Sequence, residues 1–289
     1  MQLGKIGIWS TTLRRADPTE ISEAAAELDE LGFGTLWISG GAGGPLFDDV
    51  ERLLRATERA VVATGVLNLW SHEPADVAAE HARLSAAYGR RIMLGIGVSH
   101  GPMVSRLDGA VYAKPLAKTR QYLDALDATP VPVPVAERLL GALGPRMLEL
   151  ARERSAGAHP YLVTVDHTAF ARRVLGDDAL LAPEQMVILD DDSTSARESA
   201  RAHLERYLRL PNYTNNLMKF GLSEDDLLGG GSDRLVDAVV AWGDLDAVAS
   251  RIEEHLDAGA DHVGIQVLRR DAGSMPRNEW RQLAQFLDG

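Results

Sequence analysis

The sequence of 289 residues contains no cysteine. This absence excludes disulfides, a thiol nucleophile, iron–sulfur clusters and thiolate zinc sites. Lysine is scarce as well: only four of the 30 basic residues are lysines (Lys5, Lys114, Lys118 and Lys219). Chemistry that depends on a lysine nucleophile therefore has few candidates in this chain.

Positive charge and long apolar runs are also lacking. The 42 acidic residues outnumber the 30 basic ones, and the net charge of −12 disfavours nucleic acid or an anionic membrane as a partner. An anionic ligand would need a local pocket of donors against this overall field. No stretch approaches the roughly 18 apolar residues of a membrane span. The N-terminal MQLGKIGIWS lacks the layout of a signal peptide. We therefore expect a cytoplasmic protein.

What the sequence does contain is a regular alternation of short apolar runs and amphipathic segments. The predicted strands are Lys5–Ser10, Thr35–Ser39, Val61–Leu69, Arg91–Val98, Arg138–Leu143, His159–Val163, Gln185–Leu189 and His262–Leu268. The predicted helices are Pro18–Leu31, Asp48–Ala60, Pro74–Tyr88, Pro115–Ala128, Pro145–Ser155, Thr168–Leu175, Ser193–Leu208 and Leu245–Ala258. This pattern predicts a single (β/α)8 barrel domain over residues 1–289. An open doubly wound sheet is the alternative.

One long insertion interrupts the pattern between the seventh and eighth predicted strands, at about residues 211–242. It contains PNYTNN and EDDLLGGGSDR before a helix-like segment, Leu235–Trp242. Insertions of this length in a compact domain usually shape a lid, a pocket wall or a subunit contact.

One strand–helix unit, Glu137–Thr164, has the features of an anion site. Its apolar run ends at Gly144-Pro145 and turns at once into a helix. Proline suits the first helical turn, where its missing N–H would be unsatisfied anyway, and glycine lets a ligand approach the backbone. The free N–H groups and the positive end of the helix dipole favour a phosphate at this turn.

The active site of such a barrel lies at the carboxyl ends of the strands, and this rule sorts the eight histidines. Three follow predicted strand ends: His72, His100 and His167. The others lie elsewhere, with His81, His203 and His255 in helical patterns and His159 and His262 near strand starts. His100, in the turn VSHGP, is the candidate for proton transfer, and ordering of a loop is the alternative role for all three.

Several chemistries of barrel enzymes are disfavoured. No lysine lies near a strand's carboxyl end, as a Schiff-base aldolase would need. The first strand ends Gly7-Ile8-Trp9-Ser10, without the His-x-His of metal-dependent hydrolases. The run Asp190-Asp191-Asp192 is of the kind that is usually solvated, and no strand end supplies a pair of facing carboxylates for glycoside hydrolysis. We expect no metal site.

The predicted barrel mouth is instead apolar, aromatic and rich in amides. Its side chains are Trp9, Trp37, Asn68, Trp70 and Tyr161. Such a surface suits a flat conjugated ring. In the third strand, Gly65 interrupts a good β run, which indicates a bulge or a close ligand approach, or else a plain strand glycine.

Taken together, these segments resemble the luciferase-like monooxygenase superfamily, and within it the branch of oxidoreductases that use the deazaflavin coenzyme F420. The resemblance covers nearly the whole chain. Its motifs include AAELDELGFGTLWI, ATGVLNLWSHEPADVAAEHARLS, RIMLGIGVSHGP, ALGPRMLELARERSAGAHPYLV, LRLPNYTNN, GGGSDRLVDAVVAWGD and HLDAGADHVGIQVL. Any one is weak alone, but their order and spacing are specific.

The resemblance implies a barrel, usually dimeric, that holds a flavin-like ring at its mouth and acts on a small molecule. A bulge with a non-proline cis peptide would back the ring, and the matching residues are Gly65, Val66, Leu67 and Asn68. Backbone amides at the turn identified above would bind the cofactor's phosphate, and the matching residues are Leu143, Gly144, Pro145 and Arg146. Further candidates for the phosphate and the acidic tail are Thr164, Arg172, Arg173 and Arg234.

The remaining pocket residues are assigned by position. Trp9 and His100 are the candidate catalytic residues, with His100 as the preferred proton donor. The candidates for the substrate pocket are Trp70, His72 and Tyr213.

The chain departs from the family at one important place. Relatives that oxidise sugar phosphates or alcohols carry an Asp-His pair after the second strand, where this chain has Gly40-Gly41. Either another residue at the mouth moves protons, or the reaction is a reduction that needs only a weak acid or water. The glycine-rich loop lacks the ending of a P-loop, so a widened pocket wall is the favoured interpretation.

Three hypotheses about function follow. The first is an F420-dependent oxidoreductase that passes a hydride to or from a small organic substrate. The second keeps the fold but uses FMN and oxygen as a monooxygenase. The third, motivated by the missing Asp-His pair, is a barrel that binds the deazaflavin without turnover.

Overall fold

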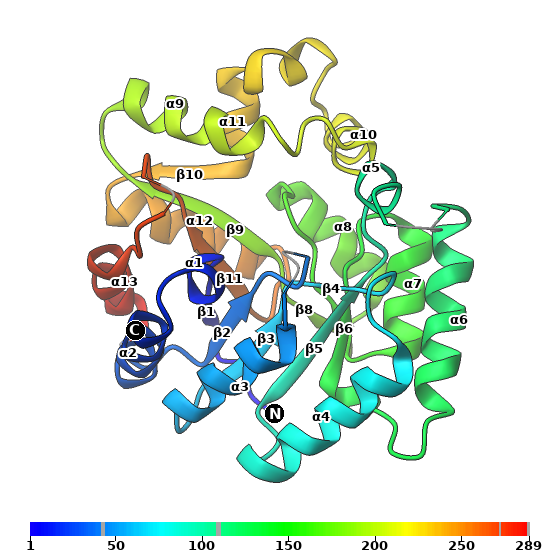
Figure 1. The fold of residues 1–289 in the computed structure, drawn as a ribbon. Coiled ribbons are helices and arrows are strands. Elements are labelled where there is room, and N and C mark those ends of the chain that lie inside the picture. Colours follow the sequence, from blue (N-terminus) through cyan, green and yellow to red (C-terminus); the bar gives the residue numbers. More distant parts are fainter. Residues whose placement is uncertain (42–43, 108–110, 272, 288–289) are drawn as a thin grey trace.

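The computed structural model describes residues 1–41, 44–107, 111–271 and 273–287 (Figure 1). The strands are β1 (Ile6–Trp9), β2 (Thr35–Ile38), β3 (Val61–Thr64), β4 (Leu67–Asn68), β5 (Ile92–Gly97), β6 (Arg138–Leu140), β7 (Gly157–Ala158), β8 (Leu180–Leu181), β9 (Glu184–Leu189), β10 (Val240–Gly243) and β11 (Val263–Val267). The α-helices are α1 (Thr12–Arg15), α2 (Pro18–Glu30), α3 (Leu46–Ala56), α4 (Pro74–Tyr88), α5 (Gly101–Val104), α6 (Pro115–Asp127), α7 (Pro145–Arg154), α8 (Val165–Leu175), α9 (Ser193–Leu204), α10 (Pro211–Lys219), α11 (Asp233–Val239), α12 (Leu245–Asp257) and α13 (Arg277–Leu283). Three short 3-10 helices are η1 (Val135–Glu137), η2 (Asp225–Gly230) and η3 (Ala284–Leu287).

The strands form a closed parallel barrel. Their hydrogen-bonded order runs β9-β11-β1-β2-β3-β5-β6-β7-β8, and all of these pairings are parallel. Only Ala182 and Pro183 separate β8 at one end of this order from β9 at the other. The two are parts of one strand, so the sheet closes on itself, and the predicted (β/α)8 fold is confirmed.

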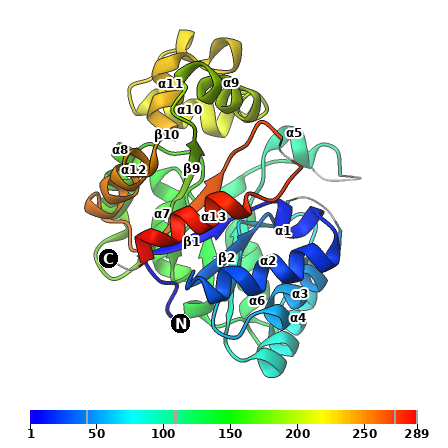
Figure 2. The ribbon, with the colours of Figure 1, turned by 90° about the vertical axis from the view of Figure 1, so that its left-hand side faces the viewer.

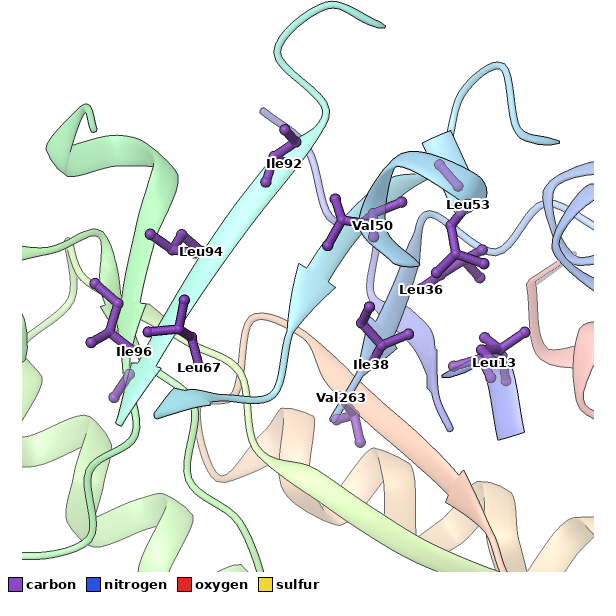
Figure 3. Close-up of a cluster of buried hydrophobic side chains, with 14 of the residues drawn as sticks. Leu13, Leu36, Ile38, Val50, Leu53, Leu67, Ile92, Leu94, Ile96 and Val263 are labelled. Carbon is purple, nitrogen blue, oxygen red and sulfur yellow. The ribbon is translucent and has the colours of Figure 1, made fainter. Parts of the chain in front are cut away.

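Apolar side chains on the outside of the strands pack against the surrounding helices. Figure 3 shows this for β2 and α3, where Leu36 and Ile38 lie near Val50 and Leu53, all fully buried. Parallel strands covered on both faces are apolar on both faces, which is why these strands read as continuous apolar runs. The C-terminal helix α13 joins this layer beside α2, where Arg277 and Arg281 pair with Glu27 (Figure 2).

A second, smaller core fills the barrel lumen. Trp37 of β2 stacks on His159, which follows β7, with ring centroids 4.2 Å apart. The Trp37 indole also donates a hydrogen bond of 2.9 Å to His262, at the foot of β11. These contacts join strands that are not neighbours in the sheet, so they cross the interior of the barrel.

Proline and capping residues fix where several helices begin. Pro18 occupies the first turn of α2, and the carboxylate of Asp17 accepts hydrogen bonds from Thr19 N and Glu20 N. Helices α4, α6, α7 and α10 likewise carry proline in the first turn. Throughout the described ranges, each helix is too short or too polar to cross a bilayer.

The long insertion lies over the carboxyl ends of the strands. Figure 2 shows α9, α10 and α11 together above the barrel, beyond the end of β9. A separate cluster of buried apolar residues, among them Leu204, Leu217 and Leu235, joins these helices. The predicted helix Leu235–Trp242 was wrong beyond residue 239, because residues 240–243 pair with β9 as the parallel strand β10.

The sixth predicted strand was also misplaced. The ladder covers Gly157–Ala158 and not His159–Val163. Pro160 has no N–H for a ladder, and Leu162 adopts a positive φ of 55° that turns the chain away. As a result, His159 lies past the strand's end and not at its start.

Candidate functional site

A cavity of roughly 1700 Å³ opens at the carboxyl ends of the strands. Loops after β1, β2, β5, β6 and β11 form its walls, and the ends of α9 and α10 cover it from above. Its position is the one that the barrel fold assigns to an active site.

One wall of the cavity is a bulge in the third strand. The chain leaves β3 after Thr64, passes a cis peptide bond between Gly65 and Val66, and resumes beside β5 at Leu67. The cis bond is the one that the family resemblance implied. Leu67 is buried in the outer core, whereas Gly65, Val66 and Asn68 line the cavity.

Glycines make room for this bulge from three neighbouring strands. A Cβ on Gly97 would lie 2.3 Å from Val66 Cγ2, and one on Gly141 would lie 3.3 Å from the same methyl. A Cβ on Gly40 would lie 2.4 Å from the carbonyl of Val66. Position 40 therefore has no space for the family's usual side chain unless the bulge moves, and a Cβ on Gly41 would meet nothing within 4 Å.

Two buried ring nitrogens point at the bulge from the lumen. A Cβ on Gly65 would lie 2.3 Å from Trp9 Nε1 and 3.1 Å from His159 Nε2, and neither nitrogen has a hydrogen-bond partner among the described residues. His159 Nδ1 lies 2.7 Å from the Ala182 carbonyl and so carries the ring's proton. Burial lowers the pKa of His159 to about 4. The cavity floor thus offers one N–H donor beside one nitrogen acceptor.

The predicted phosphate turn opens into the same cavity. Leu143, Gly144 and Met147 line it, and no side chain of the described residues caps the start of α7. A Cβ on Gly144 would meet nothing within 4 Å. The Leu143 carbonyl accepts a hydrogen bond from His167 Nε2 at 2.9 Å, so His167 holds this turn and does not line the cavity.

The other residues predicted for the phosphate lie away from the cavity wall. Pro145 and Arg146 are exposed on the first turn of α7, and Thr164 caps α8 by accepting a hydrogen bond from His167 N. Arg234 pairs with Asp226 and donates to the Gly221 carbonyl.

The two arginines of α8 are also remote from the turn. Arg172 bonds the Ala179 carbonyl, just before β8, and Asp261, just before β11. It therefore lies at the opposite end of the barrel from the cavity. Arg173 is exposed on the last turn of α8.

A row of tyrosines forms another wall. Arg206 donates to Tyr207 Oη at 3.1 Å, and Tyr161 donates to Gln266 Oε1 at 2.8 Å. Since the Tyr161 proton is engaged, Tyr207 donates the 2.8 Å bond between the two phenols. Burial raises the pKa of Tyr161 and Tyr207, so both phenols stay protonated.

His100 and Tyr213 lie together beside this row, with ring centroids 4.8 Å apart. Burial lowers the pKa of His100 to about 4, and its Nδ1 has no partner among the described residues. Burial raises the pKa of Tyr213 well above its usual value. At neutral pH the cavity therefore presents a neutral imidazole beside a neutral phenol.

Trp70 and His72, predicted for the substrate pocket, lie outside the cavity wall. The Trp70 indole turns away to donate to the Val98 carbonyl at 2.8 Å. His72 Nδ1 lies 3.0 Å from the Asn68 carbonyl. Both side chains thus support the loop that follows the bulge.

Sequence reasoning missed several residues of the cavity. His159 was assigned to the wrong end of a strand, and Pro160 immediately after it was the signal that this strand stops early. His203 was read only as helical, and it lines the cavity from α9.

Glu184 is a further buried group below the tyrosines. It is 1% exposed, its Oε1 has no partner among the described residues, and burial raises its pKa to about 8. Because the folded pKa exceeds the unfolded value, this group reduces stability progressively as pH rises from about 4.5 to 8.

We expect Glu184→Gln to be within about 1 kcal/mol of the parent in stability at pH 5, where little of this penalty has developed. At pH 9 it should be more stable by on the order of 1–3 kcal/mol, because only the parent then buries a charge. Urea unfolding at the two pH values measures this. An equal difference at both would contradict the assignment.

Comparison with known proteins agrees with this geometry. Residues 3–262 match the family model described as luciferase-like monooxygenase. A protein of Mycobacterium tuberculosis named "Putative coenzyme F420-dependent oxidoreductase" is 25% identical, over 95% of this chain and 96% of its own.

Solved structures share the fold at low identity. An F420-dependent secondary alcohol dehydrogenase in complex with an F420–acetone adduct gives a TM-score of 0.76 at 14% identity, over 98% of this chain and 97% of its own. The F420-dependent tetrahydromethanopterin reductase of Methanopyrus kandleri gives a TM-score of 0.74 at 17% identity. The match covers 99% of this chain and 98% of the reductase. A third structure is the oxygenating constituent of 3,6-diketocamphane monooxygenase from Pseudomonas putida, in complex with FMN. It gives a TM-score of 0.73 at 18% identity, over 98% of this chain and 96% of its own.

The chain shares its barrel fold with these F420-dependent and FMN-bound structures. The chain belongs to the luciferase-like monooxygenase family. The resemblance found in the sequence is therefore confirmed.

Proposed function

We propose that this chain is a coenzyme F420-dependent oxidoreductase that passes a hydride between the deazaflavin and a small organic substrate. One observation carries the proposal: the glycine-framed bulge and the uncapped start of α7 open into one cavity. The first fits a flat ring and the second fits a phosphate. The relatives named as F420-dependent support the choice of coenzyme.

The described residues fit such a group in two further ways. Trp9 Nε1 and His159 Nε2 are buried and have no hydrogen-bond partner within the described ranges, and they face the bulge as a donor and an acceptor. Lys219 lines the cavity and precedes Phe220, whose ring centroid lies 5.2 Å from that of His167. His167 in turn holds the phosphate turn through the Leu143 carbonyl. Lys219 is therefore our candidate cation for the phosphate, in place of Arg234.

When bound, the coenzyme supplies the carbon that gives or takes the hydride. Hydride transfer to an unsaturated substrate leaves one proton to be delivered to the same molecule. Tyr213, whose phenol keeps its proton, is the candidate to deliver it. His100, predicted as the proton donor, is neutral at pH 7 and lies beside Tyr213, so its candidate role is to position this phenol or to return a proton to it. No Asp-His pair is needed for reduction in this direction.

The reaction tests the proposal against its two rivals. Reduced F420 is mixed with the protein and a panel of carbonyl, imine and enone acceptors, and recovery of coenzyme fluorescence is followed. Acceptor-dependent oxidation supports the proposal. Oxygen consumption with reduced FMN would favour the monooxygenase, and tight F420 binding without turnover on any acceptor would favour a non-catalytic carrier.

Asn68 provides a local test of ring placement. Its Oδ1 accepts from Trp70 N at 3.1 Å, and the side chain lines the cavity beside the bulge. We expect Asn68→Ala to raise the Kd for F420 about tenfold, because one hydrogen bond and its ordered turn are lost. Ser71→Ala, which removes only the hydroxyl 3.3 Å from Asn68 Nδ2, is the matched control. Unchanged affinity in both variants would count against this placement.

A further inference from the structure

The cavity reverses the charge balance of the chain. The whole sequence has 42 acidic and 30 basic residues. The cavity lining holds two glutamates, Glu198 and Glu205, and a larger set of basic side chains: Arg15, Arg106, Arg206, Arg209, Lys219, Arg269 and Arg270. A basic cleft in an acidic protein concentrates anions there.

Four of these basic side chains lie at two separate places. Lys219 lies near the phosphate turn that follows β6, as described above. Arg15, Arg269 and Arg270 follow β1 and β11, which are neighbours in the sheet. In the order β1-β2-β3-β5-β6, four strand positions separate β1 from β6. In an eight-stranded barrel this places the two groups on opposite sides of the mouth.

We name the second place the β1/β11 corner. It consists of Arg15 and Arg270 with two neighbouring hydroxyl residues, Thr11 after β1 and Ser39 after the adjacent β2, and it leaves out Arg269, which pairs with Glu279. Arg15 has no carboxylate partner among the described residues, in contrast to its neighbour Arg14, which is buried against Asp49. The Thr11 and Ser39 side chains also line the cavity, and no described residue bonds their hydroxyls. The segment after β11 extends toward α9 in Figure 2, where Arg270 meets Glu198 at 3.2 Å.

Among the described residues, the same corner is open at Gly41. This glycine lines the cavity after β2, and a Cβ on it would meet no described atom within 4 Å. A guanidinium without a carboxylate partner, two free hydroxyls and an open wall are suited to an oxyanion attached to a small organic body.

We infer that the substrate is a small organic anion whose carboxylate or phosphate binds the β1/β11 corner through Arg15. Arg270 is the second ligand, for which the anion competes with the exposed partner Glu198. This inference rests on the proposed function, because it gives the substrate class of that site. The cofactor's phosphate occupies the opposite side, at the start of α7. The substrate body then lies between the corner and the bulge, next to Gly41.

Binding of simple anions tests the inference without turnover. Malonate serves as the carboxylate probe and inorganic phosphate as the phosphate probe, each titrated calorimetrically into the full chain at low salt. We expect Arg15→Gln to weaken binding of at least one probe about tenfold or more while changing the Kd for F420 less than twofold. Arg270→Gln is the second variant and should act in the same direction. Arg120→Gln, on α6, makes the same change in net charge and should have no effect.

The outcomes separate the inference from the proposed function. Loss of malonate binding alone identifies a carboxylate, and loss of phosphate binding alone identifies a phosphate ester. Anion binding that is unchanged by both corner variants overturns the inference and leaves the coenzyme assignment intact. If Arg15→Gln instead weakens F420, the corner binds the cofactor's acidic tail, and the inference is wrong. If F420 does not bind but Arg15-dependent anion binding persists, the proposed coenzyme fails and the anion site stands.

Discussion

Gly97→Ala is expected to weaken cofactor binding by about 10- to 100-fold. The new methyl would lie 2.3 Å from Val66 Cγ2, so the Val66 side chain at the ring cavity must move. Such overpacking costs about 1–3 kcal/mol, which corresponds to this loss if the shift falls on the ring site. Fluorescence titration with F420 measures the Kd.

Gly141→Ala is the matched control for this change. Its Cβ would lie 3.3 Å from the same methyl, so Val66 needs to yield only a few tenths of an ångström. We expect a change in Kd within about threefold, at similar urea stability. Equal affinity of the two variants, both folded, would show that the position of Val66 does not control cofactor binding.

Acid is expected to unfold the protein at a pH well above the range in which carboxylates usually titrate. Burial lowers the pKa of six histidines to about 3–4, namely His100, His159, His167, His203, His255 and His262. The unfolded chain therefore binds more protons than the native state as pH falls from about 6.5 toward 4, and stability is lost across that window. Each imidazole could cost up to a few kcal/mol, so the sum is comparable with the whole stability of a domain.

Glu184 opposes this trend but is outweighed. As the pH falls from 8 to 4.5, Glu184 is protonated in the folded protein and its destabilising effect disappears. This gain comes from a single group, whereas six histidines act in the opposite direction. Asp226, whose pKa is lowered to about 2 by hydrogen bonds from Ser232 and Ser223, loses its contribution only at still lower pH. Urea midpoints at pH 7.5, 6.0, 5.0 and 4.5 measure the effect. A flat profile over this range would mean that the histidines are solvated in solution.

The strand and helix pattern could be predicted because it depends on local chemistry. Pro74–Tyr88 matches α4 at both ends, since proline opens it and Gly89, with a φ of 76°, follows it. The turn at Gly144-Pro145 was found for the same reason. The cis bond at Gly65 was expected only from family resemblance, because nothing in local sequence specifies a cis peptide.

The site itself depends on long-range placement that a sequence does not display. The local sequence does not distinguish Arg172 from Arg15. Arg172 lies at the amino ends of the strands, whereas Arg15 lies at the cavity. Trp9 and His159 both approach Gly65, because the barrel interior brings together strands that are distant in the sequence. The β1/β11 corner exists only because the barrel closes and makes the last strand a neighbour of the first.

The central claim is that the bulge and the phosphate turn together hold a deazaflavin. Titration of the purified protein with coenzyme F420, and separately with FMN, tests it most directly through the fluorescence of each cofactor. We expect a Kd for F420 at or below about 1 μM, with FMN bound at least tenfold more weakly. Preference for FMN, or binding of neither cofactor, would contradict the claim.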